Sequence, residues 1–206
     1  MRTVNPERFE ARRRHVREAA LACFKRKGFH QASMADICAE AAMSPGNVYR
    51  YYDSKEAIIA AICEEDRRQL TARLERLGES GNLFDSMLAL AGEAMSARDP
   101  AKSKFGCEVL AEATRNERIA EIVRRHHAAI IALCAAAIRR AQELGQVDPG
   151  HDAEAAAAVL VAAAEGLNTR LALSPALDPV APLAAFRQLL QRFLSPPARR
   201  APPPLG

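Results

Sequence analysis

The side chains best suited to hydrogen-bond another macromolecule lie close together, between residues 44 and 55. Asn47 and Arg50 carry amide and guanidinium groups, which can hydrogen-bond the edges of DNA bases. They follow Ser44-Pro45, an order that favours a helix start because serine caps and proline fits the first helical position. Gly46 would let this helix end approach a duplex closely. The spacing predicts a short helix that inserts into the major groove of DNA.

Residues that flank this helix are suited to the DNA backbone, which positions a protein without specifying sequence. Hydroxyl and amino side chains on both sides can contact phosphates, and so can the free N–H groups at the starts of the neighbouring helices. The full set of predicted DNA contacts is Ser33, Met34, Ser44, Pro45, Gly46, Asn47, Tyr49, Arg50, Tyr51 and Lys55.

Three helices are expected to position these side chains. Apolar residues at helical spacing predict a first helix over Pro6–Lys27, which Gly28 ends. Ser33, with Asp36 three residues later, has the pattern of a capping box and starts a second helix. The third, after Ser44, is expected to end near Tyr51. Two such short helices bury little surface alone, so the first must support them in a tri-helical DNA-binding domain over 6–55.

Downstream residues 56–194 are expected to form a second helical domain. No alternating β-branched run or hairpin signal interrupts it, so an all-α fold of nine helices is predicted. The tail 195–206 contains five prolines and little apolar content, and is expected to be disordered. Beyond the third helix, the expected ranges are 53–77, Leu83–Arg98, Ser103–Asn116, Glu117–Leu144, Asp152–Leu173 and Pro182–Leu194.

The basic surplus of the chain lies in its first quarter. Residues 1–55 hold 11 Lys and Arg against 6 Asp and Glu, whereas the whole chain has a net charge of +4. A local basic excess beside a groove-reading helix is the expected electrostatic signature of a DNA-binding protein. Arg12-Arg13-Arg14 fits either phosphate contacts or a solvated start of the first helix.

Other classes of site find little support. Nucleophile-elbow, P-loop and paired-carboxylate motifs are missing from the sequence, so no catalytic residue and no cofactor is predicted. The five cysteines lack metal-ligand spacing, and His126 and His127 cannot point the same way on a helix, so no metal site is expected. Apolar runs are too short to cross a bilayer, which leads us to expect a cytoplasmic protein without a membrane partner.

The stretch from residue 12 to about residue 62 resembles the TetR/AcrR family of transcription regulators. The family pattern runs roughly A-G-[VM]-S-x-G-x-[LV]-Y-x-[HY]-F-x-[SN]-K-E. Agreement at fixed spacing covers Ala41, Met43, Ser44, Gly46, Val48, Tyr49, Tyr51, Ser54, Lys55 and Glu56, with Ala19-Ala20, Phe24 and Gly28-Phe29 upstream. Ala42 departs from the usual turn glycine, which would cost about 1 kcal/mol if the turn needs a positive φ. Tyr52 replaces the usual phenylalanine, so its hydroxyl needs a partner or solvent.

This resemblance implies a homodimeric repressor that a small-molecule effector releases from double-stranded operator DNA. It also implies a dimer interface made by the helices over 153–173 and 182–194. The alternatives are a helical-bundle enzyme, or an adaptor without sequence-specific DNA binding. Polar and apolar residues on the second domain are candidates for the effector pocket, although each also fits a core or surface role: Met87, Met95, Phe105, Glu108, Glu112, His126, Cys134 and Asn168.

Overall fold

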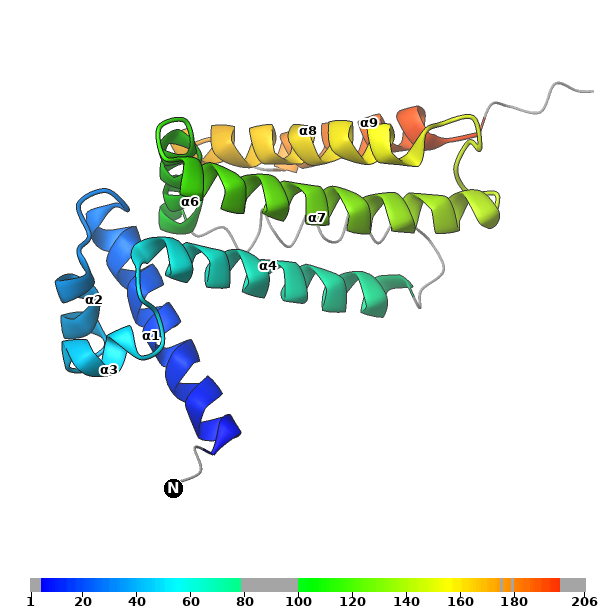
Figure 1. The fold of residues 1–206 in the computed structure, drawn as a ribbon. Helices are drawn as coiled ribbons and strands as arrows, with labels where there is room; N and C mark the ends of the chain where they lie inside the picture. The colour runs from blue at the N-terminus through cyan, green and yellow to red at the C-terminus, as the bar shows by residue number, and fades with distance from the viewer. Residues whose placement is uncertain (1–4, 79–99, 175, 179, 197–206) are drawn as a thin grey trace, which may run out of the picture.

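The computed structural model describes residues 5–78, 100–174, 176–178 and 180–196, and within these ranges the chain is helical without strands. Figure 1 shows the arrangement. The predicted helix over Leu83–Arg98 and most of the tail lie outside the described residues. The described helices are α1 (Pro6–Lys27), α2 (Met34–Glu40), α3 (Pro45–Tyr49), α4 (Lys55–Gly78), α6 (Pro100–Ala113), α7 (Glu117–Glu143), α8 (Ala153–Leu173) and α9 (Val180–Leu194).

Helices α1, α2 and α3 gather at one end of the molecule, and the longer helices form its body (Figure 1). In the body, α7 lies between α4 and α8, and packs against both. Helix α6 crosses the end of the body that faces α1, and contacts α1, α7 and α8. Both α4 and α6 therefore connect the small N-terminal helices to the body. No helix in the described ranges is long and apolar enough to cross a membrane.

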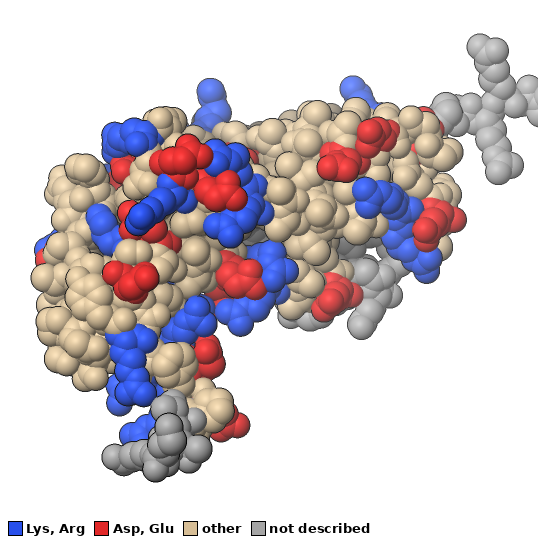
Figure 2. Space-filling view, in the orientation of Figure 1, with Lys and Arg blue, Asp and Glu red and all other residues tan. Residues whose placement is uncertain are grey.

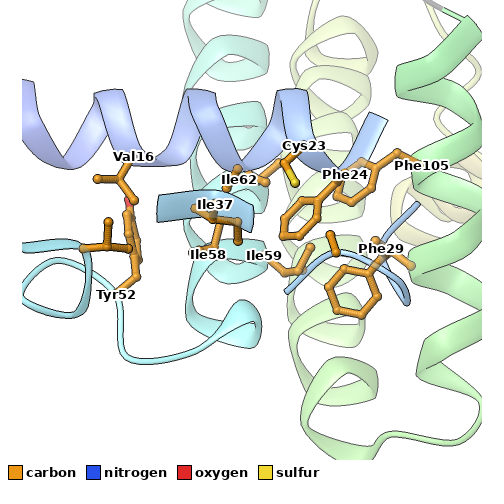
Figure 3. Packing of buried hydrophobic residues seen from close by; sticks show 14 of the residues in the cluster. Val16, Cys23, Phe24, Phe29, Ile37, Tyr52, Ile58, Ile59, Ile62 and Phe105 are labelled. Carbon is orange, nitrogen blue, oxygen red and sulfur yellow. The ribbon is translucent and has the colours of Figure 1, made fainter. Parts of the chain in front are cut away.

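Two apolar cores hold these helices together. The first joins α1, α2, α3 and α4 to α6 and α7, and Figure 3 shows most of its larger side chains. At its centre Phe24 of α1 stacks on Phe105 of α6, with ring centroids 5.4 Å apart and planes 6° from parallel. The second core lies among α7, α8 and α9, where Leu160, Leu190 and Leu194 are almost completely buried.

Helix starts account for most differences from the predicted boundaries. Helix α6 begins at Pro100, three residues before the predicted Ser103, because proline is favoured at the first position of a helix. Helix α9 begins at Val180, whose backbone N–H donates to Asp178 Oδ1 at 3.0 Å, so Pro182 falls inside its first turn. One helix end also differs, because α3 ends at Tyr49, two residues before the predicted end.

Candidate nucleic-acid interface and internal cavity

The start of α2 is fixed by the predicted capping box. Ser33 Oγ accepts a hydrogen bond from the Asp36 backbone N–H, and Asp36 Oδ2 accepts one from the Ser33 backbone N–H. Lys27 also donates to Asp36, and these hydrogen bonds hold the pKa of that carboxyl far below its usual value. The Ser33 hydroxyl is thus engaged within α2, while its predicted phosphate contact, like that of Met34, stays a prediction.

The turn between α2 and α3 has a positive φ at Ala42, where the family pattern usually has glycine. Ala42 has a φ of +51°, in the left-handed region where an L side chain is strained. The Met43 backbone N–H donates to Cys38 O at 3.0 Å, and His15 Nε2 of α1 lies 2.9 Å from Ala41 O. These hydrogen bonds hold the backbone on both sides of Ala42. The strained conformation is therefore confined to that residue.

Helix α3 presents its polar side chains to solvent and buries one apolar residue. Val48 is fully buried in the first core, whereas Pro45, Gly46 and Asn47 are exposed. A Cβ built on Gly46 would meet nothing within 4 Å, so no internal packing requires glycine there. Without a side chain at position 46, the backbone of this helix end is open to close approach by another molecule.

Arg50 follows α3 directly, and is exposed. Within the described part of the chain its guanidinium has neither an ion-pair nor a hydrogen-bond partner. By contrast, Arg26 pairs with Glu40, and Lys27 with Asp36. Figure 2 likewise shows positive and negative side chains interspersed over the face in view. The net basic charge of the first quarter is therefore partly used inside the protein, while Arg50 keeps its five N–H donors for an outside acceptor.

The tyrosines of this region have three different environments. Tyr49, the last residue of α3, is half exposed, so it can reach an external phosphate. Tyr51 packs on Phe9 of α1 with ring centroids 5.0 Å apart. Tyr52 is buried, which raises the pKa of its hydroxyl, and the Arg13 guanidinium lies over its ring, 5.4 Å from the centroid. The tyrosine at this unusual position therefore packs against a cation of α1.

Lys55 has a structural partner that the sequence did not indicate. Its Nζ donates to Phe29 O at 2.9 Å and lies 4.5 Å from the centroid of the Phe29 ring. The side chain thereby ties the first turn of α4 to the loop between α1 and α2. Its predicted phosphate contact remains untested.

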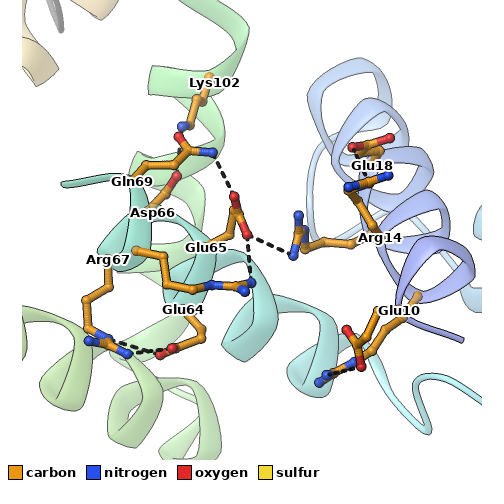
Figure 4. A network of polar contacts seen from close by, with 12 residues as sticks. Glu10, Arg14, Glu18, Glu64, Glu65, Asp66, Arg67, Gln69 and Lys102 are labelled. Atoms are coloured by element: carbon orange, nitrogen blue, oxygen red, sulfur yellow. Dashed lines mark hydrogen bonds and ion pairs between the residues drawn. The ribbon is translucent and has the colours of Figure 1, made fainter. Parts of the chain in front are cut away.

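A network of ion pairs joins α1 to α4 (Figure 4). Arg17 of α1 lies 3.3 Å from Glu65 Oε2 of α4, and both side chains are mostly buried. Gln69 also donates to Glu65 at 3.0 Å, and Arg68 pairs with it. The hydrogen bond from Gln69 and the charges of Arg17 and Arg68 lower the pKa of Glu65. This network adds a polar link to the apolar core between the same two helices.

A cavity of about 410 Å³ lies among α4, α6, α7 and α8. Of the residues predicted for an effector pocket, it is lined by Phe105, His126 and Asn168, while Met87 and Met95 lie outside the described residues. Most of the other polar lining residues were not selected from the sequence, because they come from four helices whose packing is not readable from local pattern. Those residues are Cys63, Asp66, Arg73, Lys102, Ser103, Cys107, Glu165 and Thr169.

The other three pocket candidates lie outside the lining of this cavity, and a role for them in effector binding stays a prediction. Glu108 faces the opposite side of α6, where its Oε2 accepts from the Phe29 backbone N–H at 2.6 Å. Glu112 lies one turn further along the same side and pairs with Arg115. Cys134 packs against the second core, and burial raises the pKa of its thiol. Helical periodicity identified apolar faces but could not say which neighbour each polar residue would meet.

Glu108 explains a glycine of the N-terminal domain. Gly28 has a φ of +84°, and a Cβ built on it would lie 3.0 Å from Glu108 Oε2. The backbone conformation favours glycine there, and a Cβ would also crowd the Glu108 carboxylate. The contact joins the end of α1 to the helix that also supplies one wall of the cavity.

These features define the class of protein. Two short helices at a fixed turn, with an exposed polar recognition helix on a helical body, form a helix-turn-helix DNA-binding protein. A sequence model of "Bacterial regulatory proteins, tetR family" matches residues 16–62, and one of "BetI-type transcriptional repressor, C-terminal" matches residues 86–195. The chain therefore belongs to the TetR family of transcriptional regulators, and is not an enzyme.

Relatives agree with this assignment. The chain is 34% identical over 141 residues to the HTH-type transcriptional regulator UidR of Escherichia coli K12, covering 66% of this chain and 69% of UidR. The structure of Salmonella enterica GusR is 29% identical, with a TM-score of 0.76 over 94% of this chain and 99% of GusR. A putative TetR-family regulator from Rhodococcus sp. has a TM-score of 0.78 at 21% identity, covering 89% and 98% of the two chains, which shows the shared fold.

Proposed function

We propose that this chain is a homodimeric repressor that reads operator DNA with α3 and leaves it when a small molecule binds the cavity. The main support for DNA recognition is the exposed surface formed by Gly46, Asn47 and Arg50. This surface has no packing role in the described structure. An amide and a guanidinium one helical turn apart can hydrogen-bond successive base pairs in the major groove.

The dimer interface is assigned to α8 and α9. Small and apolar residues at helical spacing form an exposed stripe on α8, including Ala155, Val159, Ala162 and Gly166. On α9, Leu189 and Phe193 are exposed as well, while Leu190 and Leu194 bury the opposite face in the second core. Two copies of such a helix pair can form a four-helix interface, in which small residues allow close approach.

Helix α6 supports a route from the cavity to the DNA-binding helices. Phe105 lines the cavity and also stacks on Phe24 of α1, while Glu108 on the same helix binds the Phe29 backbone N–H. A ligand that moves α6 would therefore shift the end of α1 and the helices packed on it. In a dimer, such shifts change the spacing of the two recognition helices and so the fit to two half-sites.

A gel-shift with DNA from the promoter region of the chain's own gene tests the DNA-binding role. We expect retardation of a specific fragment that excess unrelated DNA does not compete away, and its loss with Arg50→Ala. Sedimentation at micromolar concentration should give a dimer, and Val159→Glu on the exposed stripe should give monomers of unchanged helix content. A folded dimer that binds no fragment at low salt would support the adaptor alternative instead, and a wild-type monomer would refute the interface.

A further inference from the structure

The run of three arginines on α1 is divided by the partners of its members. Arg13 Nη1 lies 3.6 Å from Glu10 Oε1, and Arg14 Nε lies 3.9 Å from Glu18 Oε1. Arg12, the first of the run, is exposed, and its guanidinium has neither an ion pair nor a hydrogen bond among the described residues. Of the three arginines, Arg12 is therefore the one whose donors are not engaged by the described part of the protein.

The neighbours of Arg12 on α1 fix where its side chain leaves the helix. Phe9, three residues earlier, packs on Tyr51, which follows α3. His15, three residues later, has its Nε2 2.9 Å from Ala41 O, in the turn that precedes α3. Residues three apart are about 60° apart around a helix, so Arg12 lies midway between these two contacts. It therefore belongs to the face of α1 that meets the segments on both sides of the recognition helix.

Arg8 extends this face by one turn. It precedes Arg12 by four residues, a spacing that places two side chains on the same side of a helix, and it too is exposed and has no side-chain partner in the described ranges. The acidic residues of α1 are Glu7, Glu10 and Glu18, and each lies about 120° or more around the helix from Arg12. Arg8 and Arg12 thus form a basic stripe. In Figure 2, positive side chains lie between α3 and the N-terminal end of α1.

The chemistry of the basic stripe suits phosphate oxygens. A guanidinium presents its N–H donors in a planar fork that matches the oxygens of a phosphate group. A recognition helix in the major groove is bordered by the two phosphate backbones, and a helix beside it lies over one of them. The stripe continues the exposed surface of α3, where Arg50 also has no partner among the described residues. This continuity favours the DNA backbone over an acidic protein.

We propose that Arg8 and Arg12 bind backbone phosphates of the operator, beside the groove that α3 enters. This inference rests on the proposed DNA-reading function of α3. The basic stripe adds affinity without sequence preference, because a phosphate is the same at every base pair. It divides the work of DNA binding between two elements, with α3 reading bases and the first turns of α1 holding the strand.

The salt dependence of DNA binding by the full chain tests the proposal. The probes are a labelled promoter fragment that the wild type retards and an unrelated duplex of equal length, followed by fluorescence anisotropy. Each phosphate contact contributes about 0.9 to the slope of log affinity against log salt, so Arg8→Gln/Arg12→Gln should reduce the slope by about 1.8 per protomer. Affinity for both duplexes should fall by the same factor. Arg8→Lys/Arg12→Lys, which keeps the charges, should keep the slope.

The matched control is Arg139→Gln/Arg140→Gln near the end of α7, which removes the same charge from two exposed arginines far from α3. It should leave the slope within about 0.5 of wild type. An equal reduction in this control would overturn the proposal, because net charge would then account for the effect. An unchanged slope in Arg8→Gln/Arg12→Gln, with operator binding intact, would overturn it as well.

Arginine modification of the wild type makes the test independent of how any variant folds. Phenylglyoxal modifies exposed guanidinium groups, and mass spectrometry locates the modified residues. The promoter fragment should protect Arg8 and Arg12, whereas Arg139 should react equally with and without DNA. Equal reaction of Arg8 and Arg12 in both states, by protein that still binds the fragment, would overturn the basic stripe and leave reading by α3 standing. A wild type that binds neither duplex would refute the proposed function and the stripe together.

Discussion

Replacing Gly46 by alanine separates DNA contact from folding more cleanly than any other change on α3. The added methyl group meets nothing within 4 Å in the protein, and Gly46 lies in the first turn of the helix without a positive φ. Alanine is favoured over glycine in helices by about 0.5–1 kcal/mol, so the free energy of unfolding should stay equal or rise by up to that amount. No structural defect can then account for a change in DNA binding.

Operator affinity should nevertheless fall. If the surface of Gly46 lies against the duplex, one extra methyl group in a close-fitting contact costs about 1–3 kcal/mol. That range corresponds to a loss of about five- to 150-fold for each recognition helix. Fluorescence anisotropy with a labelled operator fragment measures the affinity, and urea denaturation measures the stability.

The matched control is Ala42→Gly, in the turn four residues earlier. It relieves an alanine held at a φ of +51°, at the expense of a more flexible unfolded chain, and should raise the free energy of unfolding by up to about 1 kcal/mol. Because Ala42 precedes the recognition helix, operator affinity should change less than twofold. Wild-type affinity in Gly46→Ala would refute the assignment of this helix end to the DNA surface.

Three further predictions concern the neighbouring contacts. Arg50→Ala should weaken operator binding by about 1–3 kcal/mol per half-site and relax preference at one base position, as competition with single-base operator variants would show; unchanged specificity would disprove base reading by Arg50. Lys55→Met should lower the free energy of unfolding by about 1–3 kcal/mol in urea titrations, because the Phe29 carbonyl loses a charged donor, and a stability equal to wild type would contradict that structural role. Glu65→Gln should lower stability at pH 7 by about 1 kcal/mol or less. The folded-state pKa of Glu65 is lowered, so the stabilisation by its carboxylate is complete above the ordinary value of 4.5 and is lost as the pH falls through the lowered value. The free energies of unfolding of wild type and variant should therefore converge in acid. A difference that stays constant with pH would argue against the ion pair.

Local chemistry accounts for the part of the structure that the sequence predicted well. The capping box at Ser33 and Asp36, the helix start at Ser44-Pro45 and the helix end at Gly28 each depend on a few consecutive residues. The pair Asp99-Pro100 fits both the end of the helix predicted over Leu83–Arg98 and the start of the next helix. In that case the local signal was ambiguous, and the start of α6 was predicted too late.

The cavity could be predicted only in part, since its lining depends on how four helices rotate against one another. Glu108 and His126 are both polar residues on otherwise apolar helices, and their sequence context does not separate them. The structure places His126 on the cavity wall and Glu108 against the loop after α1. Lys55 was assigned to DNA because its amino group beside the recognition helix suits a phosphate contact, and its bond to Phe29, 26 residues earlier, has no signature in the sequence.

The apolar core around Phe24 has a consequence for protein engineering. Ile58, Ile59 and Phe105 belong to the same buried cluster as the side chains of α1, α2 and α3. In a chimera joined at residue 55, the DNA-reading helices of this protein would be followed by a foreign sensor domain. The Phe24 ring would then lose its stacking partner Phe105 and become exposed to water, and Gly28 would lose its contact with the Glu108 carboxylate. A transplant of the operator specificity of this protein should therefore exchange the exposed residues of α3 alone, within the host's own core.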